Sequence, residues 1–496
     1  MKPSPSPAAM AVAMAGALLI AVGLPLLWLT QGHGDYTLDD PYIHLALAQR
    51  IAQGFYGLNP GESAAPSSSL LWPLLLTLLG AQRFAPLLIN VACTLASAWL
   101  LGRLVGQWSW PQDAASTRRQ ALTLLLLLLA GNLIGLAYSG MEHSLQLLLT
   151  IACAYALQCA WQQREIPRAC LLAAALGPAV RYELLSLLLL MATLLWLQQR
   201  RRDAVLLLLS GTLPLLGFAL FLHAQGLPPL PGSVMVKEGL HGDGAQFLLQ
   251  RLHEAWQDRR SIPLLLLGAA CLWQAGAQRA QRRWMLLAAA GVAVAHLLCG
   301  RYGWFYRYEI YAALFLSLVL LISLQPVQPQ RWRYSAYLLA MLALLYLPGT
   351  LLAPLSARNI YEQQYQMHRF VSLWWRRDVA ANDIGWLAYG TQPLRVLDLV
   401  GLATPEAARP DKDAAWLQAI VARRKIGLVM IYPNWFGQVP AQWILLAQLR
   451  LGSRPIVVGG DTVNFYASSP QAAAELRPLL RDFAASLPAG PHLELR

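Results

Sequence analysis

The chain has 496 residues, of which 57% are apolar and only 13% charged, about half the charged share of a typical soluble domain. This composition excludes an ordinary soluble protein and indicates an integral membrane protein. The net charge of +13 does not indicate a nucleic-acid-binding protein, because the arginines cluster between apolar segments, as they do beside membrane spans.

Apolar segments of about 17 to 25 residues, long enough to cross a bilayer, follow one another through the first two thirds of the chain. The predicted spans are residues 9–30, 84–105, 122–138, 144–161, 204–224, 262–278, 284–300, 310–325 and 334–352, with a short apolar piece at 68–80 and a stretch at 170–196 broken at Arg181. The arginine-rich connections are expected in the cytoplasm. This arrangement gives about eleven crossings, roughly seven of them before the polar segment 225–261.

The loop after the first span carries two adjacent acids, Asp39 and Asp40, and the predicted orientation places it on the outer side of the membrane. Asp40 precedes Pro41, which is typical of a helix N-cap, and predicts a helix over residues 41–53 lying along the interface. Asp39 then has no structural role. Because acids close to hydrocarbon are costly and tend to be functional, Asp39 is a candidate catalytic carboxylate.

Lys237 is the only lysine between Lys2 and Lys412 in a chain that otherwise uses arginine. A compact ammonium suits a phosphate oxygen, so Lys237 is a candidate phosphate contact. The alternative interpretation is a solvated lysine in the long loop.

Three further groups of polar residues lie beside predicted spans, and each has two interpretations. Glu142 and His143 either hold sugar hydroxyls or simply begin the next helix. Arg181 is either a phosphate contact or the ion-pair partner of Glu183. The segment 301–309 combines two arginines with five aromatic residues. An interfacial aromatic belt explains its rings but not its two arginines.

From residue 354 the apolar runs shorten and acids return. Strand-like pieces at 395–399, 425–431 and 455–458 alternate with helical segments, which predicts a soluble α/β domain over residues 354–496, following a membrane module over 1–353. Such a domain either docks an acceptor or acts as a passive lid. The six cysteines are isolated thiols, and no metal-ligand spacing, phosphate-binding loop or dinucleotide fingerprint is present, so no metal or cofactor is expected.

Several of these motifs together resemble the GT-C glycosyltransferases, membrane enzymes that take a sugar from a polyprenyl-phosphate carrier. The resemblance covers Asp39-Asp-Pro-Tyr-Ile43, the Gly-x-x-Gly-x-Asn-Pro-Gly-Glu run at 54–62, Ser-Gly-Met-Glu at 139–142, the Leu-Pro-x-Ser segment leading to Lys237, and Trp-Phe-Tyr-Arg-Tyr at 304–308. Two loops of the C-terminal region, 382–385 and 398–402, also resemble loops in external domains of this group. The bacterial arabinofuranosyltransferases look most similar, with protein mannosyltransferases and aminoarabinose transferases more distant. Residues 63–68 depart from the family pattern.

The resemblance implies a polytopic α-helical fold of GT-C type with an outer C-terminal domain, and it implies roles for individual residues. Asp39 and Asp40 would be the catalytic carboxylates. Lys237, Arg181 and Arg307 would contact the donor phosphate. Sugar or acceptor contacts are implied at Tyr42, Asn59, Glu142, His143 and Tyr306.

The expected function is therefore an inverting transfer of a sugar, arabinofuranose being one candidate, from the carrier lipid to an envelope glycan, glycolipid or protein. The reaction is expected on the outer side of the inner membrane. The alternatives are a lipid-linked sugar transporter or flippase and a non-catalytic assembly protein. A transporter usually shows internal repeats, and none is found in the sequence.

Overall fold

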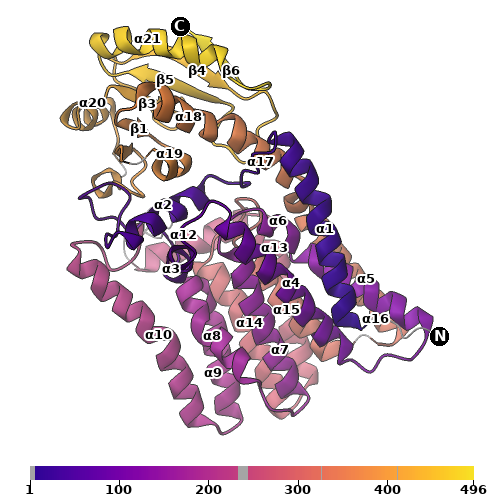
Figure 1. Cartoon of the computed structure of the whole chain (residues 1–496). Coiled ribbons are helices and arrows are strands. Elements are labelled where there is room, and N and C mark those ends of the chain that lie inside the picture. The colour runs from indigo at the N-terminus through magenta and orange to yellow at the C-terminus, as the bar shows by residue number, and fades with distance from the viewer. Residues whose placement is uncertain (1–5, 233–243, 326, 392, 410) are drawn as a thin grey trace. The chain divides into compact units, whose positions relative to one another are not determined.

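A computed structural model of the chain describes residues 6–232, 244–325, 327–391, 393–409 and 411–496 (Figure 1). The chain forms two compact units. Unit one comprises residues 1–23, 87–217 and 241–351, and unit two comprises 24–86, 218–240 and 352–496. The last segment of unit two begins at Leu352, next to the predicted domain boundary, and the two shorter segments join it.

Unit one is made of helices. They include α5 (Ala114–Ala130), α6 (Leu133–Ala137), α7 (His143–Trp161), α8 (Arg168–Val180), α9 (Leu185–Leu197), α12 (Gly244–Gln257), α13 (Ser261–Ala277), α14 (Ala280–Cys299), α15 (Ile310–Leu324) and α16 (Pro329–Leu351). Helices α1 (Pro7–Leu29), α4 (Ala85–Gly106) and α10 (Arg201–Ala224) begin or end in this unit and continue into the other. Within it α13 packs along α14, α5 along α16 and α7 along α8.

The described residues contain six helices that are long and apolar enough to cross a membrane. They are Pro7–Leu29, Ala85–Gly106, His143–Trp161, Arg201–Ala224, Ala280–Cys299 and Pro329–Trp375, and four shorter apolar helices accompany them. Large apolar side chains such as Trp28 and Trp273 are about four-fifths exposed, at 79% and 82%, which suits lipid rather than water. The chain is therefore a multi-pass membrane protein, while the count of eleven crossings stays a prediction.

The predicted break at Arg181 is confirmed. Helix α8 contains Pro178 and ends at Val180, Arg181 is extended with φ −151° and ψ 132°, and a short 3-10 turn (Tyr182–Leu184) leads into α9. Proline removes a backbone donor and favours such a break. The polar segment 225–261, predicted as a loop, contains the helix α12.

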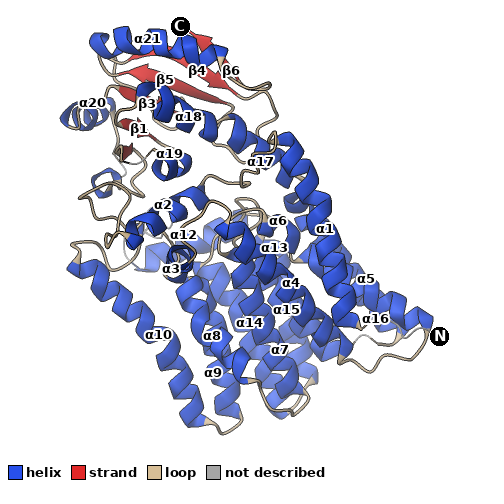
Figure 2. Ribbon diagram, in the orientation of Figure 1, coloured by secondary structure: helices blue, strands red, loops and turns tan. Residues whose placement is uncertain are grey.

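Unit two contains a six-stranded mixed sheet in the order β2-β1-β3-β5-β4-β6 (Figure 2). Its strands are β1 (Val379–Ala381), β2 (Val396–Asp398), β3 (Leu428–Ile431), β4 (Ile444–Arg450), β5 (Thr462–Ala467) and β6 (His492–Leu495). Strands β1, β2 and β3 are mutually parallel, and the pairs β3–β5, β5–β4 and β4–β6 are antiparallel. The predicted polytopic helical fold with a C-terminal α/β domain is therefore confirmed.

Both faces of this sheet are covered, because its strand residues alternate between two apolar cores. Val379 and Ala381 pack with helices α18 (Gln364–Phe370) and α21 (Pro470–Ala485), whereas Ala380 packs with α20 (Ala414–Arg423). The unit also contains the helices α3 (Leu71–Leu78), α17 (Ala353–Glu362) and α19 (Gly385–Gly390).

The strand predicted at 455–458 is wrong. This segment connects β4 to β5 as a series of bends between Pro455 and the Gly459–Gly460 pair. The backbone N–H of Ile456 donates to Asn359 Oδ1 (2.7 Å) instead of to a neighbouring strand. A strand needs a neighbouring strand as its backbone hydrogen-bond partner, and here a side chain satisfies the backbone N–H instead.

The acidic loop also differs from its prediction. Helix α2 runs over Asp40–Ala52, so Asp39 occupies the N-cap position and makes no side-chain capping bond. The assignment of Asp40 as the cap is therefore wrong. Nor is α2 an interfacial helix with one covered face: Pro41 to Ala48 are all buried, and α3 and α19 pack against the helix. The carboxylate of Asp39 instead accepts hydrogen bonds from a different helix, α19.

Candidate active site

The Asp39 carboxylate is held by the backbone of α19, 346 residues later in the sequence. Its Oδ2 accepts from the N–H of Gly385 (2.5 Å), and its Oδ1 accepts from the N–H of Trp386 (2.9 Å). Only 6% of Asp39 is exposed. A side chain at residue 385 would overlap the carbonyl oxygen of Asp39, so glycine is required for this close approach.

Asp383 is a second carboxylate beside Asp39, and the sequence analysis did not select it. Its Oδ2 accepts from Gln364 Nε2 (2.7 Å) and from the hydroxyl of Tyr432 (3.1 Å). The same hydroxyl lies 2.6 Å from Gln363 Oε1. The only sequence signal for Asp383 was its place in the loop 382–385, which resembles a loop of the transferase group.

The two carboxyl groups interact directly, and both hold a proton more tightly than usual. Burial and then the neighbouring charge of Asp383 raise the pKa of Asp39 well above its ordinary 3.8, and this outweighs the two backbone N–H donors. Burial also raises the pKa of Asp383, and the charge of half-buried Asp40 adds to that shift. Pairs of carboxyl groups with such raised pKa values are typical of acid–base sites, although structural networks also produce them.

A third acid, the buried Asp35, contacts the aromatic side chains around Asp39. Asp35 Oδ1 accepts from the hydroxyl of Tyr42 (2.9 Å) and from Trp386 Nε1 (3.1 Å), and its Oδ2 lies 2.6 Å from His33 Nδ1. The rings of Tyr42 and Trp386 stack with centroids 4.1 Å apart. Tyr42, a predicted sugar contact, is fully buried and serves here to hold α2 and α19 together. Its predicted contact with a sugar is untested.

Asn59, another predicted sugar or acceptor contact, joins its loop to the edge strand β2. Its Nδ2 donates to the carbonyl of Val396 (3.0 Å), and its Oδ1 accepts from the N–H of the same residue (2.9 Å), as a neighbouring strand would. Its Nδ2 also lies 3.1 Å from Glu62 Oε2. The loop 54–62 is thereby fixed on the sheet, and the predicted contact stays a prediction.

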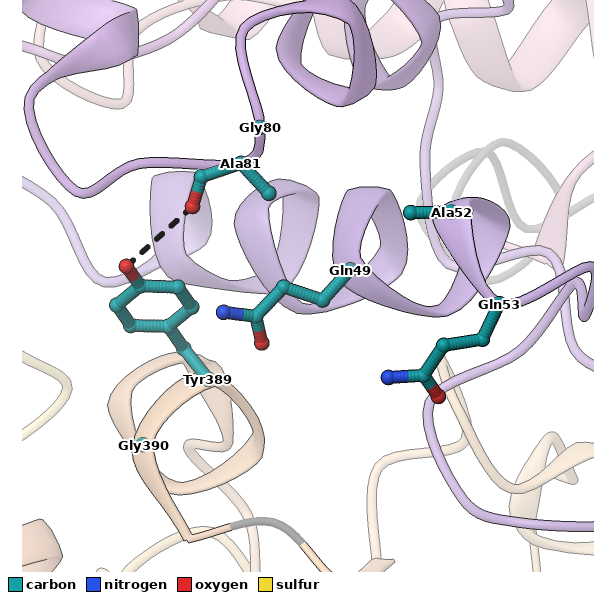
Figure 3. A pocket seen from close by; sticks show the side chains of 7 residues that line it. All are labelled: Gln49, Ala52, Gln53, Gly80, Ala81, Tyr389 and Gly390. Carbon is teal, nitrogen blue, oxygen red and sulfur yellow. Dashed lines mark hydrogen bonds between the residues drawn. The ribbon is translucent and has the colours of Figure 1, made fainter.

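A pocket of ≈ 390 Å³ opens along the two helices that hold Asp39 (Figure 3). It is lined by Gln49, Ala52, Gln53, Gly80, Ala81, Tyr389 and Gly390, and the hydroxyl of Tyr389 donates to the carbonyl of Ala81 (3.4 Å). The lining is uncharged and carries two amides and one phenol. Such groups suit a hydroxyl-rich ligand, and a pocket of this size falls in the usual range for small-molecule sites.

The remaining described candidates lie in unit one, where Arg181 connects three parts of the chain. Its Nη1 donates to Glu142 Oε1 (3.0 Å), and its Nη2 and Nε donate to the two oxygens of Glu183 (2.5 and 3.1 Å). The ion-pair interpretation of Arg181 therefore describes the structure, and the residue is only 7% exposed. A phosphate contact at Arg181 would have to compete with two carboxylates.

Three of the other candidate site residues lie around the ring of Tyr308. The ring of His143 lies edge-on to it (6.1 Å), and the guanidinium carbons of Arg181 and Arg307 lie 5.6 and 5.0 Å from its centroid. Arg307 Nη2 also donates to its hydroxyl (3.0 Å). The adjacent Glu142 and His143 thus form one buried cluster with the distant Arg181 and Arg307, while their predicted contacts with a donor stay predictions.

Tyr306 stands apart from this cluster within the unit. Its ring lies edge-on to Tyr346 (6.0 Å) and near the guanidinium of Arg260 (5.8 Å). The residues Trp304, Phe305 and Tyr306 all have positive φ, from 41° to 64°, following Gly303 at 80°. Consecutive left-handed residues other than glycine are strained, and such strain clusters at functional sites. Lys237 lies outside the described residues, so its predicted role is untested.

Comparison with known proteins adds one partial family match and two similar folds. Residues 358–466 match a family described as "Domain of unknown function (DUF8728)", a stretch that includes β1 to β4 and most of β5. No curated protein sequence matches the chain.

The two similar solved structures are both bound to polyprenyl phosphates. ArnT from Cupriavidus metallidurans, bound to undecaprenyl phosphate, is 13% identical, with a TM-score of 0.49 over 92% of this chain and 98% of that chain. The archaeal oligosaccharyltransferase AglB from Archaeoglobus fulgidus, in complex with an inhibitory peptide and a dolichol-phosphate, is 11% identical, with a TM-score of 0.45 over 92% of this chain and 74% of that chain.

Proposed function

We propose that this protein is a GT-C-type glycosyltransferase that moves a sugar from a polyprenyl-phosphate carrier to an envelope acceptor, with Asp39 as the catalytic base. The observation that carries this proposal is the buried Asp39–Asp383 pair. Asp39 lies in the loop after the first membrane span, whose sequence resembles the catalytic loop of these enzymes, and Asp383 follows β1. A carboxylate held by two backbone N–H groups keeps one orientation, as a positioned base requires.

The chemistry follows from the raised pKa of the pair. A base works best when its pKa approaches the working pH, because an ionised carboxylate of ordinary pKa is a poor proton acceptor. We propose that the two carboxyl groups share one proton, and that Asp39, in its ionised form, takes the proton of the acceptor hydroxyl. The acceptor oxygen then forms a bond to the anomeric carbon, and the bond from that carbon to the phosphate oxygen breaks.

The leaving group is the polyprenyl phosphate, which changes from a diester to a monoester and gains negative charge. Lys237 and Arg307 are the cations proposed to stabilise it, with Arg181 in a supporting role because Glu142 and Glu183 already share its charge. Attack opposite the leaving group inverts the anomeric carbon. Arabinofuranose is the proposed sugar, a glycan, glycolipid or protein the acceptor, and the outer face of the inner membrane the site of reaction.

Sugar transfer by the purified full-length chain tests the proposal. Synthetic polyprenyl-phosphate arabinofuranose labelled in the sugar is mixed with envelope glycan fragments, and labelled product and free polyprenyl phosphate are measured. We expect both to appear together, and to disappear with Asp39→Asn but not with Asp482→Asn, an exposed aspartate on α21. Movement of the labelled lipid across a vesicle membrane with neither product formed would contradict transfer and favour a flippase.

The carboxylate pair predicts a pH-dependent stability. The folded chain binds protons at Asp39 and Asp383 that the unfolded chain releases above about pH 4. The contribution of the pair to the free energy of unfolding is therefore fully present below about pH 4 and is lost as the pH rises through the raised pKa values. Thermal unfolding midpoints between pH 4 and 8 should fall more steeply with pH for the wild type than for Asp383→Asn. Parallel curves would show that the pair does not hold these protons.

The pocket between α2 and α19 predicts an effect on acceptor use. Ala52 lines this pocket and is exposed, so Ala52→Trp should fill it without disturbing the core. We expect the KM for the acceptor to rise about tenfold or more, while hydrolysis of the donor in the absence of acceptor keeps its rate. The matched control is Ala485→Trp, which also alters an exposed alanine at the last residue of a helix, α21. Equal acceptor KM values for the two variants would remove the pocket from the acceptor path.

A further inference from the structure

The N-terminal edge of the parallel strands in unit two is strongly basic. Strands β1, β2 and β3 are parallel and in register at their first residues, since Val379 pairs with both Val396 and Leu428. Parallel strands begin at the same edge of a sheet, so the residues that precede each of them come together. Arg395 stands directly before β2, and Arg423, Arg424 and Lys425 stand shortly before β3.

A pocket of ≈ 170 Å³ lies at this edge. Its lining contains four basic residues, Arg395, Arg423, Arg424 and Lys425, and two acidic ones, Glu62 and Asp378, together with Asn59, Leu397 and Ile426. The pocket is therefore concave and carries more positive than negative charge. Such a shape concentrates the electrostatic potential and favours a small anion. Its volume suits one charged group better than a whole sugar chain.

Two of the four cations, Arg423 and Arg424, already form ion pairs with acidic side chains at this edge. Arg424 Nη2 lies 2.9 Å from Glu62 Oε1 and 2.7 Å from Glu406 Oε1, and Arg423 Nη2 lies 2.5 Å from Glu406 Oε2. Asp378 Oδ1 accepts from the backbone N–H of Arg395 (2.8 Å), not from its guanidinium. In the described part of the chain, the guanidinium of Arg395 and the ammonium of Lys425 have no ion-pair partner.

The pocket also has a fixed wall, which holds Arg424 in place. Asn59 is bonded to both backbone groups of Val396, and Glu62 is bonded to Asn59 and Arg424. These hydrogen bonds hold the loop 54–62 on one side of the pocket, and they hold the turn before β3 on the other side. A positioned cation such as Arg424 binds an oxyanion with less loss of side-chain entropy than an isolated surface cation does.

We infer that this basic pocket is an oxyanion site that binds a phosphate group, with Arg395 and Lys425 as its two principal contacts. A guanidinium fork presents two parallel N–H groups to such oxygens, and an ammonium adds a point charge. The site is separate from the Asp39–Asp383 pair, which lies after the carboxyl end of β1, at the opposite edge of the parallel strands. This inference rests on the proposed function: if the protein is a sugar transferase, the bound phosphate belongs to the acceptor, and the protein selects phosphorylated acceptors.

Binding of inorganic phosphate to the full-length protein in a neutral detergent tests the site without any transfer reaction. The readout is isothermal titration, with Arg395→Gln, Lys425→Gln and the double variant beside the wild type. We expect saturable binding, weakened about threefold by each single change and about tenfold by the double change, since exposed charge contacts are individually modest. Both residues are exposed, so the variants should fold normally, and their unfolding midpoints check this.

The control is Arg481→Gln, which removes one exposed arginine from α21 in the same domain and should leave phosphate binding unchanged. Equal weakening by Arg481→Gln and Arg395→Gln, or absence of saturable binding, would overturn the inference. Glucose 6-phosphate and a short-chain phosphatidic acid in the micelle then distinguish a sugar-borne from a lipid-borne phosphate, with glucose as the neutral comparison. Loss of transfer in the Asp39→Asn variant with phosphate binding intact would separate this site from the catalytic one.

Discussion

Asp39→Asn should lower the rate of sugar transfer by about three orders of magnitude, within the range of a lost general base. Asparagine keeps the size of the side chain but cannot accept the proton of an acceptor hydroxyl. The substitution also places an NH₂ group against two N–H donors, those of Gly385 and Trp386, which now face both oxygens of Asp39. One of these hydrogen bonds must be lost, so the orientation of the side chain should suffer together with its basicity.

The measurement is single-turnover transfer from a synthetic donor, with Asp40→Asn and Asp482→Asn as comparisons. Asp40 is half-buried and begins α2, and its charge faces Asp383. We expect Asp40→Asn to have a smaller effect than Asp39→Asn, and Asp482→Asn to have none. If Asp40→Asn is the more damaging change, Asp40 is the base, and Asp39 serves chiefly to hold the loop on α19.

Lys237→Ala should slow the chemical step by roughly a hundredfold, a loss on the order of 3 kcal/mol. As the bond between the sugar and the phosphate breaks, the phosphate gains charge. A fixed cation therefore stabilises the transition state more than the bound donor. Lys237→Arg should restore part of the rate, because arginine returns the charge but its planar fork requires a different geometry.

Single-turnover rates at two salt concentrations test this role of Lys237. A site beside a membrane-embedded carrier should keep most of the effect at moderate salt, whereas a solvated surface lysine should lose it. Transfer at the wild-type rate by Lys237→Ala would return this residue to the solvated-loop interpretation. Arg307 would then be the leading candidate for the phosphate contact.

Local pattern alone was sufficient for the six long apolar helices, the break at Arg181 and the helix after the acidic loop, whereas the predicted span 122–138 is interrupted between α5 and α6. These features depend on the length of apolar runs, on proline and on charges in a short window, which act through nearby residues. Local pattern failed at several places, and two of them show the reason. The apolar residues 455–458 have the composition of a strand but no backbone partner, and the residue before Pro41 is not the helix cap, because Asp39 takes that position.

The pairing of distant residues was decided by the tertiary structure. Asp39 could be chosen from the sequence because it is an acid without a local structural role. Nothing in the sequence indicated that the backbone N–H groups of Gly385 and Trp386 would bind it. The same holds for Asp35 and Trp386, which are 351 residues apart, and for Glu142 and Arg181, which are 39 apart. A buried carboxylate needs hydrogen-bond donors, and that need can be read locally. Which donors meet it depends on how the sheet and its helices pack, and short-range spacing carries no information about that.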